Sequence, residues 1–287
     1  MQKVFGVIIV MVCVVGGFLM SGGNIASFWQ PGEIIIILGS GLGAMVLANP
    51  RPVLKEMFRQ FKSCMQKDEY TDEYQRQLLI LLYELLELVQ SGGLKVLDEH
   101  IEEPHNSSLF QRYPLILRDE ALITFISDNF RLMAMGKINA HELEGILEQE
   151  LVAMEENLLQ PSRSLQRTAE AMPGFGICAA VLGIIITMQS IDGSIAIIGV
   201  KVAAALVGTF LGVFFCYCLM DPVSNAMEQR TKNLLSVLEC VRTVLVNHAA
   251  GKPTLLAVDA GRKMLPMASK PTFATLDGWV AEMMGEE

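Results

Sequence analysis

Four long stretches without a charged residue constrain this chain more than any other feature. They cover residues 4–20, 34–48, 172–191 and 202–220. A helix needs about 20 mostly apolar residues to cross a bilayer, so the last two stretches fit a span directly, and the first two need their glycine- or tryptophan-rich flanks. The composition, 52% hydrophobic and 18% charged, is typical of a membrane protein with a sizeable polar part. The sequence predicts an all-α polytopic membrane protein with four transmembrane helices and a helical cytoplasmic domain.

Charges beside these stretches predict the orientation. Lys3 precedes the first stretch, as in a secretory signal, but no small-residue cleavage site follows, so we interpret the stretch as a retained anchor. The connections at 21–33 and 192–194 contain no Lys or Arg. Basic residues instead flank the other ends of the spans: Arg51, Lys55, Arg59, Lys62, Lys67, Arg163, Arg167, Arg230 and Lys232. Because Lys and Arg mark the cytoplasmic side, we expect both termini in the cytoplasm.

The remaining sequence has a helical pattern. Leucines at helical spacing fill residues 78–91 and stop at a Gly-Gly pair, which is a helix C-cap signal. Residues 114–159 read as two amphipathic helices broken near Gly136, and residues 225–251 read as one long amphipathic helix that continues the fourth span. We therefore expect four segments. They are a transmembrane hairpin at 1–50, a cytoplasmic helical domain at 51–171, a second transmembrane hairpin at 172–220, and a cytoplasmic C-terminal helix and tail at 221–287.

Several classes of function lack support in the sequence. The net charge of −9 and the lack of a basic tract argue against nucleic-acid binding. The six cysteines form no CxxC pair and the four histidines are scattered, so we expect reduced thiols, no metal site and no cofactor. No P-loop is present, and the glycine-rich run at 39–44 lies inside an apolar stretch, where small residues serve close helix packing. We expect no enzyme.

Spans three and four combine small residues with very few polar side chains. Their small residues are Gly174, Gly176, Ala179, Ala180, Gly183, Ala203, Ala204, Ala205, Gly208 and Gly212. Deep inside, only Thr187 and Thr209 are polar, and each hydroxyl either bonds its own helix backbone or lines a narrow hydrated path. Asp192, Lys201 and Asp221 lie at helix ends. We therefore expect no buried carboxylate that could carry a proton through the membrane, so either the chain moves no ion or a partner supplies the acid.

Five stretches carry a resemblance to a known family: "GGFLMSGGNIASFWQPGE" at 16–33, "AMPGFGICAAVLG" at 171–183, "KVAAALVGTFLG" at 201–212, "YCLMDP" at 217–222 and "AVDAGRKMLPMASKPTF" at 257–273. In content, order and spacing the chain resembles the MotA family of flagellar motor stator proteins, within the MotA/TolQ/ExbB superfamily. The resemblance implies a proton-driven unit of the bacterial inner membrane. Five such subunits would surround two copies of a MotB-type partner, whose membrane aspartate and periplasmic domain would provide the acid and the hold on peptidoglycan. Spans three and four would line the bore, and the cytoplasmic domain would push the rotor protein FliG.

The same resemblance assigns individual residues. Pro173 and Pro222 match prolines that couple ion passage to movement of the cytoplasmic domain; for Pro173 a simple helix-start role is the alternative, because proline fits the first turn of a helix. Thr209 matches a pore-lining threonine, and Thr187 joins it on the expected ion path. Ala180 stands where sodium-driven relatives tend to carry threonine, which favours protons.

The expected rotor-facing surface departs from the family pattern. The acid is Asp98, followed by Glu99, but the basic position corresponds to Gln90, and Lys95 is the nearby alternative source of positive charge. This departure suggests a rotor matched to the variant and a lateral or secondary flagellar system. The other acids of the middle block form either a solvated face or an interaction surface.

Three other functions remain open on the sequence. An ExbB/TolQ-type energiser shares the superfamily but has one span before its cytoplasmic block, so the early hairpin disfavours it. A passive membrane scaffold would not depend on the proton-motive force. A solute transporter would need broken or polar helices at the midplane, usually in repeated halves, and the sequence shows neither.

Overall fold

A computed structural model describes residues 2–66, 70–136, 138–189, 194–267 and 269–285. Every regular element within these ranges is helical, as expected. Contacts divide the chain into two compact units. The first, which we call the membrane unit, comprises Met1–Lys67 and Leu158–Gln229; the second, which we call the α4 unit, comprises Asp68–Asn157 and Arg230–Glu287. The connection between the predicted spans three and four falls at residues 190–193, which lie outside the described residues.

The membrane unit contains the apolar helices. Its elements are α1 (Gln2–Met20), η1 (Ile25–Phe28), α2 (Pro31–Ala48), α3 (Arg51–Cys64), the C-terminal part of α8 (Ala140–Met188), α9 (Ile195–Phe214), the π-helix η5 (Phe215–Met220) and the start of α10 (Asp221–Ala249). Among the described residues, three helices are long and apolar enough to cross a membrane: Pro31–Ala48, Ala140–Met188 and the continuous Ile195–Ala249. The apolar helix Phe5–Met20 is shorter, so the count of four spans stays a prediction.

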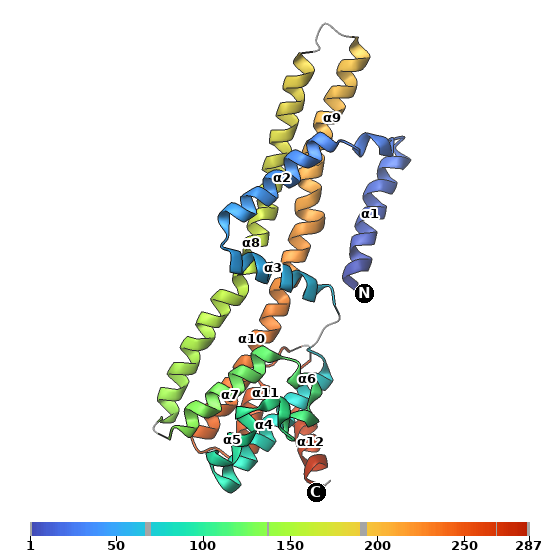
Figure 1. Cartoon of the computed structure of the whole chain (residues 1–287). Coiled ribbons are helices and arrows are strands. Elements are labelled where there is room, and N and C mark those ends of the chain that lie inside the picture. The colour runs from blue at the N-terminus through green and yellow to red at the C-terminus, as the bar shows by residue number, and fades with distance from the viewer. Residues whose placement is uncertain (1, 67–69, 137, 190–193, 268, 286–287) are drawn as a thin grey trace. The chain divides into compact units, whose positions relative to one another are not determined.

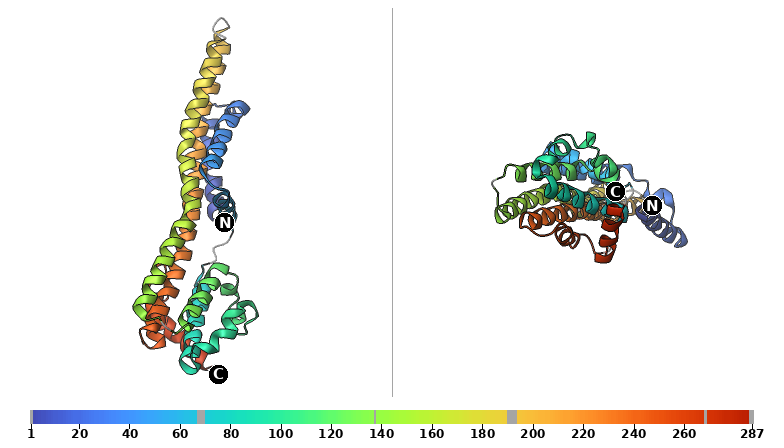
Figure 2. Two further views of the ribbon diagram at one scale, coloured as in Figure 1. Left: turned by 60° about the vertical axis from the view of Figure 1, so that its left-hand side comes forward. Right: turned by 90° about the horizontal axis from the view of Figure 1, so that it is seen from below.

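The long helices start and end where their sequences allow. Pro31 occupies the first turn of α2, where its missing N–H breaks no bond. The helix of the fourth span begins at Ile195, before residue 202, and α10 continues it to Ala249 as one long helix, which confirms the expected continuation. Figures 1 and 2 show α8 and α9 running side by side within the membrane unit.

The amphipathic helix α3 belongs to the membrane unit although it follows the second span. Met57 and Cys64 on its apolar side pack with Leu165 of α8 and Met227 of α10. The boundaries of the two units therefore differ from the boundaries of the four segments expected from the sequence. Because contacts between helices do not locate a bilayer, those segment boundaries remain predictions.

The α4 unit is built around α4 (Asp72–Gly92). Thr71 caps this helix by accepting a hydrogen bond from the backbone N–H of Tyr74 at 3.3 Å, and the helix stops before Gly93, whose φ of 74° suits glycine. The end expected at Gly92–Gly93 is thus confirmed. Leucines all around α4 are buried, which makes it the centre of the core. The surrounding elements are η2 (Leu94–Leu97), α5 (Asp98–Glu102), η3 (Pro104–Asn106), η4 (Phe110–Arg112), α6 (Pro114–Leu117), α7 (Glu120–Ala134), α11 (Thr254–Arg262) and α12 (Phe273–Gly285).

The expected break near Gly136 is present, because α7 ends at Ala134 and Gly136 has a φ of 76°. The expectation of one helix before that break is wrong. The segment is divided into α6 and α7, since the Asp119 carboxylate caps α7 by accepting from the N–H of Leu122 at 3.2 Å. A capping aspartate starts a new helix even within an amphipathic pattern.

Candidate functional site

Glycines bring α8 and α9 into close contact in the membrane unit. A Cβ atom on Gly176 would lie 2.9 Å from the carbonyl oxygen of Gly208 and 3.0 Å from the Cα of Gly212. One on Gly212 would lie 2.7 Å from the carbonyl oxygen of Met172. Real Cβ atoms essentially never come closer than 3.0 Å to other atoms, so a side chain at these positions would clash with backbone and the two helices pack with their backbones in contact. The structure confirms the expected role of the small residues at these three glycines.

The predicted ion-path residues lie on these two helices. Ala180 on α8 and Thr209 on α9 are half-buried, and Thr209 directly follows Gly208. Thr187 is 3% exposed, and its hydroxyl donates a hydrogen bond to the carbonyl of Gly183 at 2.8 Å. For Thr187 the backbone-bonded alternative is therefore the one found. All three assignments to an ion path remain predictions.

A carboxylate that is not among the predicted site residues reaches this helix pair. Glu33 lies in the first turn of α2. Its Oε2 would be 2.6 Å from a Cβ atom added to Gly208, and its Oε1 would be 3.2 Å from a Cβ atom added to Gly183. Oε2 is buried and has no hydrogen-bond partner within the described residues. The expectation that this chain buries no carboxylate among its spans is therefore wrong. The sequence feature that could have indicated this contact is Glu33 itself, a single acid at the start of an apolar run, together with Gly183 and Gly208 in the later spans.

Pro173 lies deep inside α8, which runs unbroken from Ala140 to Met188 and contains Pro161 as well. The helix-start role is therefore wrong, since the helix begins far upstream. A proline inside a helix removes one backbone hydrogen bond and crowds the preceding turn. Pro173 is half-buried between the buried Met172 and the exposed Gly174. Its role in coupling remains a prediction.

Pro222 coincides with a change in helix geometry. The helix widens to a π-helix over Phe215–Met220, and the N–H of Asp221 donates to the carbonyl of Cys216 five residues earlier. Because Pro222 has no N–H, the normal bond to the carbonyl of Cys218 cannot form, and the wider turn accommodates this loss. Single π-turns inside α-helices often occur at functional sites. The surrounding helix is otherwise continuous.

The predicted rotor-facing acids lie on the α4 unit. Asp98 and Glu99 are exposed in the first turn of α5, directly after η2. They line an open hollow of about 520 Å³ whose other lining residues are His100, Glu102, Glu103, Asn106, Ser107 and Ser108. The hollow is strongly acidic. No group of three or more side chains suited to hold a metal ion occurs within the described residues.

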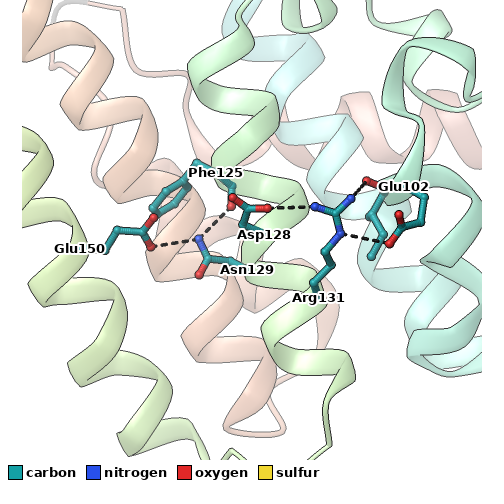
Figure 3. Close-up of polar contacts among 7 residues, drawn as sticks. Glu102, Phe125, Asp128, Asn129, Arg131 and Glu150 are labelled. Carbon is teal, nitrogen blue, oxygen red and sulfur yellow. Dashed lines mark hydrogen bonds and ion pairs between the residues drawn. The ribbon is translucent and has the colours of Figure 1, made fainter.

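Arg131 of α7 holds α5 in place, as Figure 3 shows. Its guanidinium donates to the carboxylate of Glu102 at 3.2 Å, to the carbonyl of Ile101 at 3.0 Å and to Asp128 at 3.0 Å. On the other side of α7, buried Asn129 donates to Glu150 of α8 at 3.3 Å. A chain of contacts thus runs from α5 through α7 to α8. Nothing in the local sequence marks the role of Arg131, because its α5 partners Glu102 and Ile101 lie 29 and 30 residues earlier in the chain.

The two residues predicted for the basic side of the rotor-facing surface, Gln90 and Lys95, have different surroundings. Gln90 at the end of α4 accepts a hydrogen bond from the hydroxyl of Thr254 at 3.1 Å, so it serves as a tie to α11. Lys95 is exposed in η2, three residues before Asp98 in the chain. The geometry is consistent with Lys95 as the source of positive charge, and this assignment stays a prediction.

Two family profiles match the chain. Residues 4–93 match the family described as "Motility protein A N-terminal", and residues 118–240 match the "MotA/TolQ/ExbB proton channel family". The first match covers α1, α2, α3 and α4. The second covers most of the remainder, including both long helices of the membrane unit.

Relatives and solved structures agree with these profiles. The chain is 56% identical to the chemotaxis protein LafT of Vibrio parahaemolyticus over 99% of this chain and all of the relative. It is 32% identical to motility protein A of Escherichia coli over 96% of this chain and 94% of the relative. The fold matches that in the structure of C. jejuni MotAB with a TM-score of 0.77 at 15% identity, covering 93% and 96% of the two chains. It also matches the flagellar MotAB stator complex from Bacillus subtilis with a TM-score of 0.73 at 21% identity, covering 94% and 98%. The resemblance drawn from the sequence is confirmed, and the chain belongs to the MotA family.

Proposed function

We propose that this chain is the ion-conducting stator subunit of a bacterial flagellar motor, working with a MotB-type partner to convert the proton-motive force into torque. The observation that carries the proposal is the close α8–α9 pair, joined at Gly176, Gly208 and Gly212 and free of charged side chains from residue 172 to 188. Such a pair suits the wall of a narrow path. Membership of the MotA family and whole-length similarity to named motility proteins support it.

The finer features of the proposal follow the family resemblance. We propose a pentamer in the inner membrane with both termini in the cytoplasm and FliG as the rotor partner, contacted through the acidic face of α5. Ala180 supports protons as the transported ion. The protein is proposed to catalyse no reaction and to need no cofactor. Greater identity to LafT than to the Escherichia coli relative supports a specialised, lateral or secondary flagellar system.

An ExbB/TolQ-type energiser is the second candidate, because one of the matching profiles includes that group. The other profile, over residues 4–93, is specific to motility protein A and covers the early apolar helices. This part of the chain favours the stator.

Co-expression with a candidate MotB-type partner tests the proposal. In a host lacking its own stators, the pair should restore rotation, and the pair with the partner's membrane aspartate changed to asparagine should assemble without rotating. Neither subunit alone should support rotation. If no MotB-type partner restores rotation while both proteins reach the membrane together, the chain is not a stator subunit.

A further inference from the structure

A carboxyl group sits in a gap between the two helices of the proposed ion path. Glu33 extends from the first turn of α2 toward Gly183 of α8 and Gly208 of α9. A Cβ on Gly208 would approach Oε2 to 2.6 Å, closer than real Cβ atoms come to other atoms. A side chain at Gly208 would therefore make the carboxyl group, the end of a flexible side chain, move from its present position.

Oε2 of the carboxyl group is buried without a hydrogen-bond partner within the described residues. The other side chains beside Gly183 and Gly208 are those of Ala205 and Ala179, which are apolar. An ionised carboxylate in such a place is costly unless a proton or cation joins it. Natural proteins rarely keep an ionisable group inside a membrane region without a function.

The charged groups around the gap are few. On α2, Glu33 is the sole charged side chain, and α8 contributes none from residue 172 to 188. On α9 the sole charged residue is Lys201, which is seven positions before Gly208 and so lies on the same face, about 10 Å along the axis. The polar neighbours in sequence are Thr187, one turn after Gly183 and bonded to its carbonyl, and Thr209.

We propose that the carboxyl group of Glu33 is a proton-binding site of the ion path, supplied by this chain in addition to the acid of the partner. A proton arriving through the path forms an O–H bond at Oε2, and that bond breaks when the proton passes to the next acceptor, so no net change remains on Glu33. The carboxyl group lies against Gly183 of α8 and Gly208 of α9. The inference rests on the proposed function of the chain as an ion-conducting subunit.

Proton flux in vesicles containing the full complex with its MotB-type partner tests this site. The variants are E33Q, which keeps the shape but binds no proton, and G208A, which keeps the acid but displaces its carboxyl group from Gly208. Gly174→Ala is the control, because a Cβ there meets nothing within 4 Å. A positioned proton-transfer group contributes a factor of roughly 100 or more. Flux per assembled complex should therefore fall to about one hundredth in E33Q, fall clearly in G208A, and stay unchanged in the control.

Infrared spectra of the purified complex at acid and alkaline pH separate proton binding from a structural role. We expect a carboxyl band that titrates in the wild type and is missing in E33Q. Equal flux per complex in E33Q and wild type, or an unchanged carboxyl band, overturns the proposal. If the wild type itself carries no flux, the proposed function fails, and the infrared comparison still decides whether Glu33 binds a proton.

Discussion

Single glycines decide how closely α8 and α9 approach. At Gly176 an added methyl group would overlap backbone atoms of Gly208 and Gly212, whereas at Gly174, on the same helix, it would meet open space. The two positions look alike in the sequence, since both follow Pro173 within three residues.

We expect Gly176→Ala to force the helices apart at a cost of about 1–3 kcal/mol, typical of overpacking. The amount of assembled complex in membranes should fall, measured by co-purification with the partner. Gly174→Ala is the matched control and should assemble normally. Equal assembly of the two variants would show that the helices are not held at this contact.

Asp259 in α11 anchors the end of the α4 unit. Burial acts to raise the pKa of its carboxyl group, but bonds from Lys263 and Arg262 outweigh burial, so the pKa lies below the usual 3.8. Arg262 reaches Asp259 with Nε at 2.8 Å and also donates to the carbonyl of Pro271 at 2.6 Å. The pair ties α11 to the segment before α12.

We expect Arg262→Ala to lower the free energy of unfolding by roughly 3 kcal/mol at neutral pH, because it leaves a buried carboxylate short of a partner. A lowered pKa stabilises the folded state above the unfolded value, so this contribution is lost as pH falls below 3.8 toward the folded pKa. Fluorescence of Trp279 during denaturant unfolding, in a Trp29→Phe background, measures it. Lys252→Ala, on the surface, is the control. A difference that persists undiminished in acid would contradict the role of Asp259.

At the scale of elements, Pro222 and the π-helix before it form one feature. The missing N–H of Pro222 explains why the hydrogen bonds shift from four to five residues over Phe215–Met220.

We expect Pro222→Ala to restore the bond to Cys218, remove the π-turn and fix the helix in one geometry. The complex should assemble normally but rotate the rotor slowly, measured by bead rotation at matched expression. Pro161→Ala is the comparison, because Pro161 lies inside a different helix, α8. Motors with this variant should rotate at wild-type speed. Wild-type speed in Pro222→Ala would rule out a role for this turn in coupling.

Helix α5 has only five residues, and the bonds from Arg131 of α7 to Ile101 and Glu102 help to hold it, and with it Asp98 and Glu99, in place. We expect Arg131→Ala to lower torque several-fold with normal membrane abundance, because α5 loses two bonds from α7. Arg59→Ala is the control, since Arg59 pairs with Glu56 of its own helix. Charge reversal at Asp98 should give the same defect without loss of abundance. A parallel fall in abundance would make both residues structural.

At the scale of the whole molecule, the ion that drives the motor is the feature to establish. We expect rotation to stop with a protonophore and to continue without sodium, because the family resemblance predicts that Ala180 stands where sodium-driven relatives tend to carry a threonine. Rotation speed of tethered cells in sodium-free buffer measures this. Rotation that requires sodium would remove the proton assignment.

The sequence by itself determined the elements whose causes are local. Apolar runs determined the membrane helices, leucine spacing and the Gly92–Gly93 pair determined α4 and its end, and Gly136 marked a break through its left-handed backbone. The stretches shared with the MotA family predicted the fold and the family, which the comparisons confirmed. These features depend on residues close together in the chain, so they can be predicted from the sequence alone.

Only the tertiary structure decided which residues meet across the chain. Glu33 was passed over because its partners in space, Gly183 and Gly208, lie far along the sequence and a glycine gives no sign of what fills its space. The role of Arg131 could not be predicted for the same reason, because Glu102 is distant in the chain. Gln90 accepts a hydrogen bond from Thr254 of α11, which the sequence did not predict. The helix-start alternative for Pro173 is excluded only by α8, which runs through that position. Packing between segments distant in the chain determines these contacts, and the helix propensity of nearby residues does not predict them.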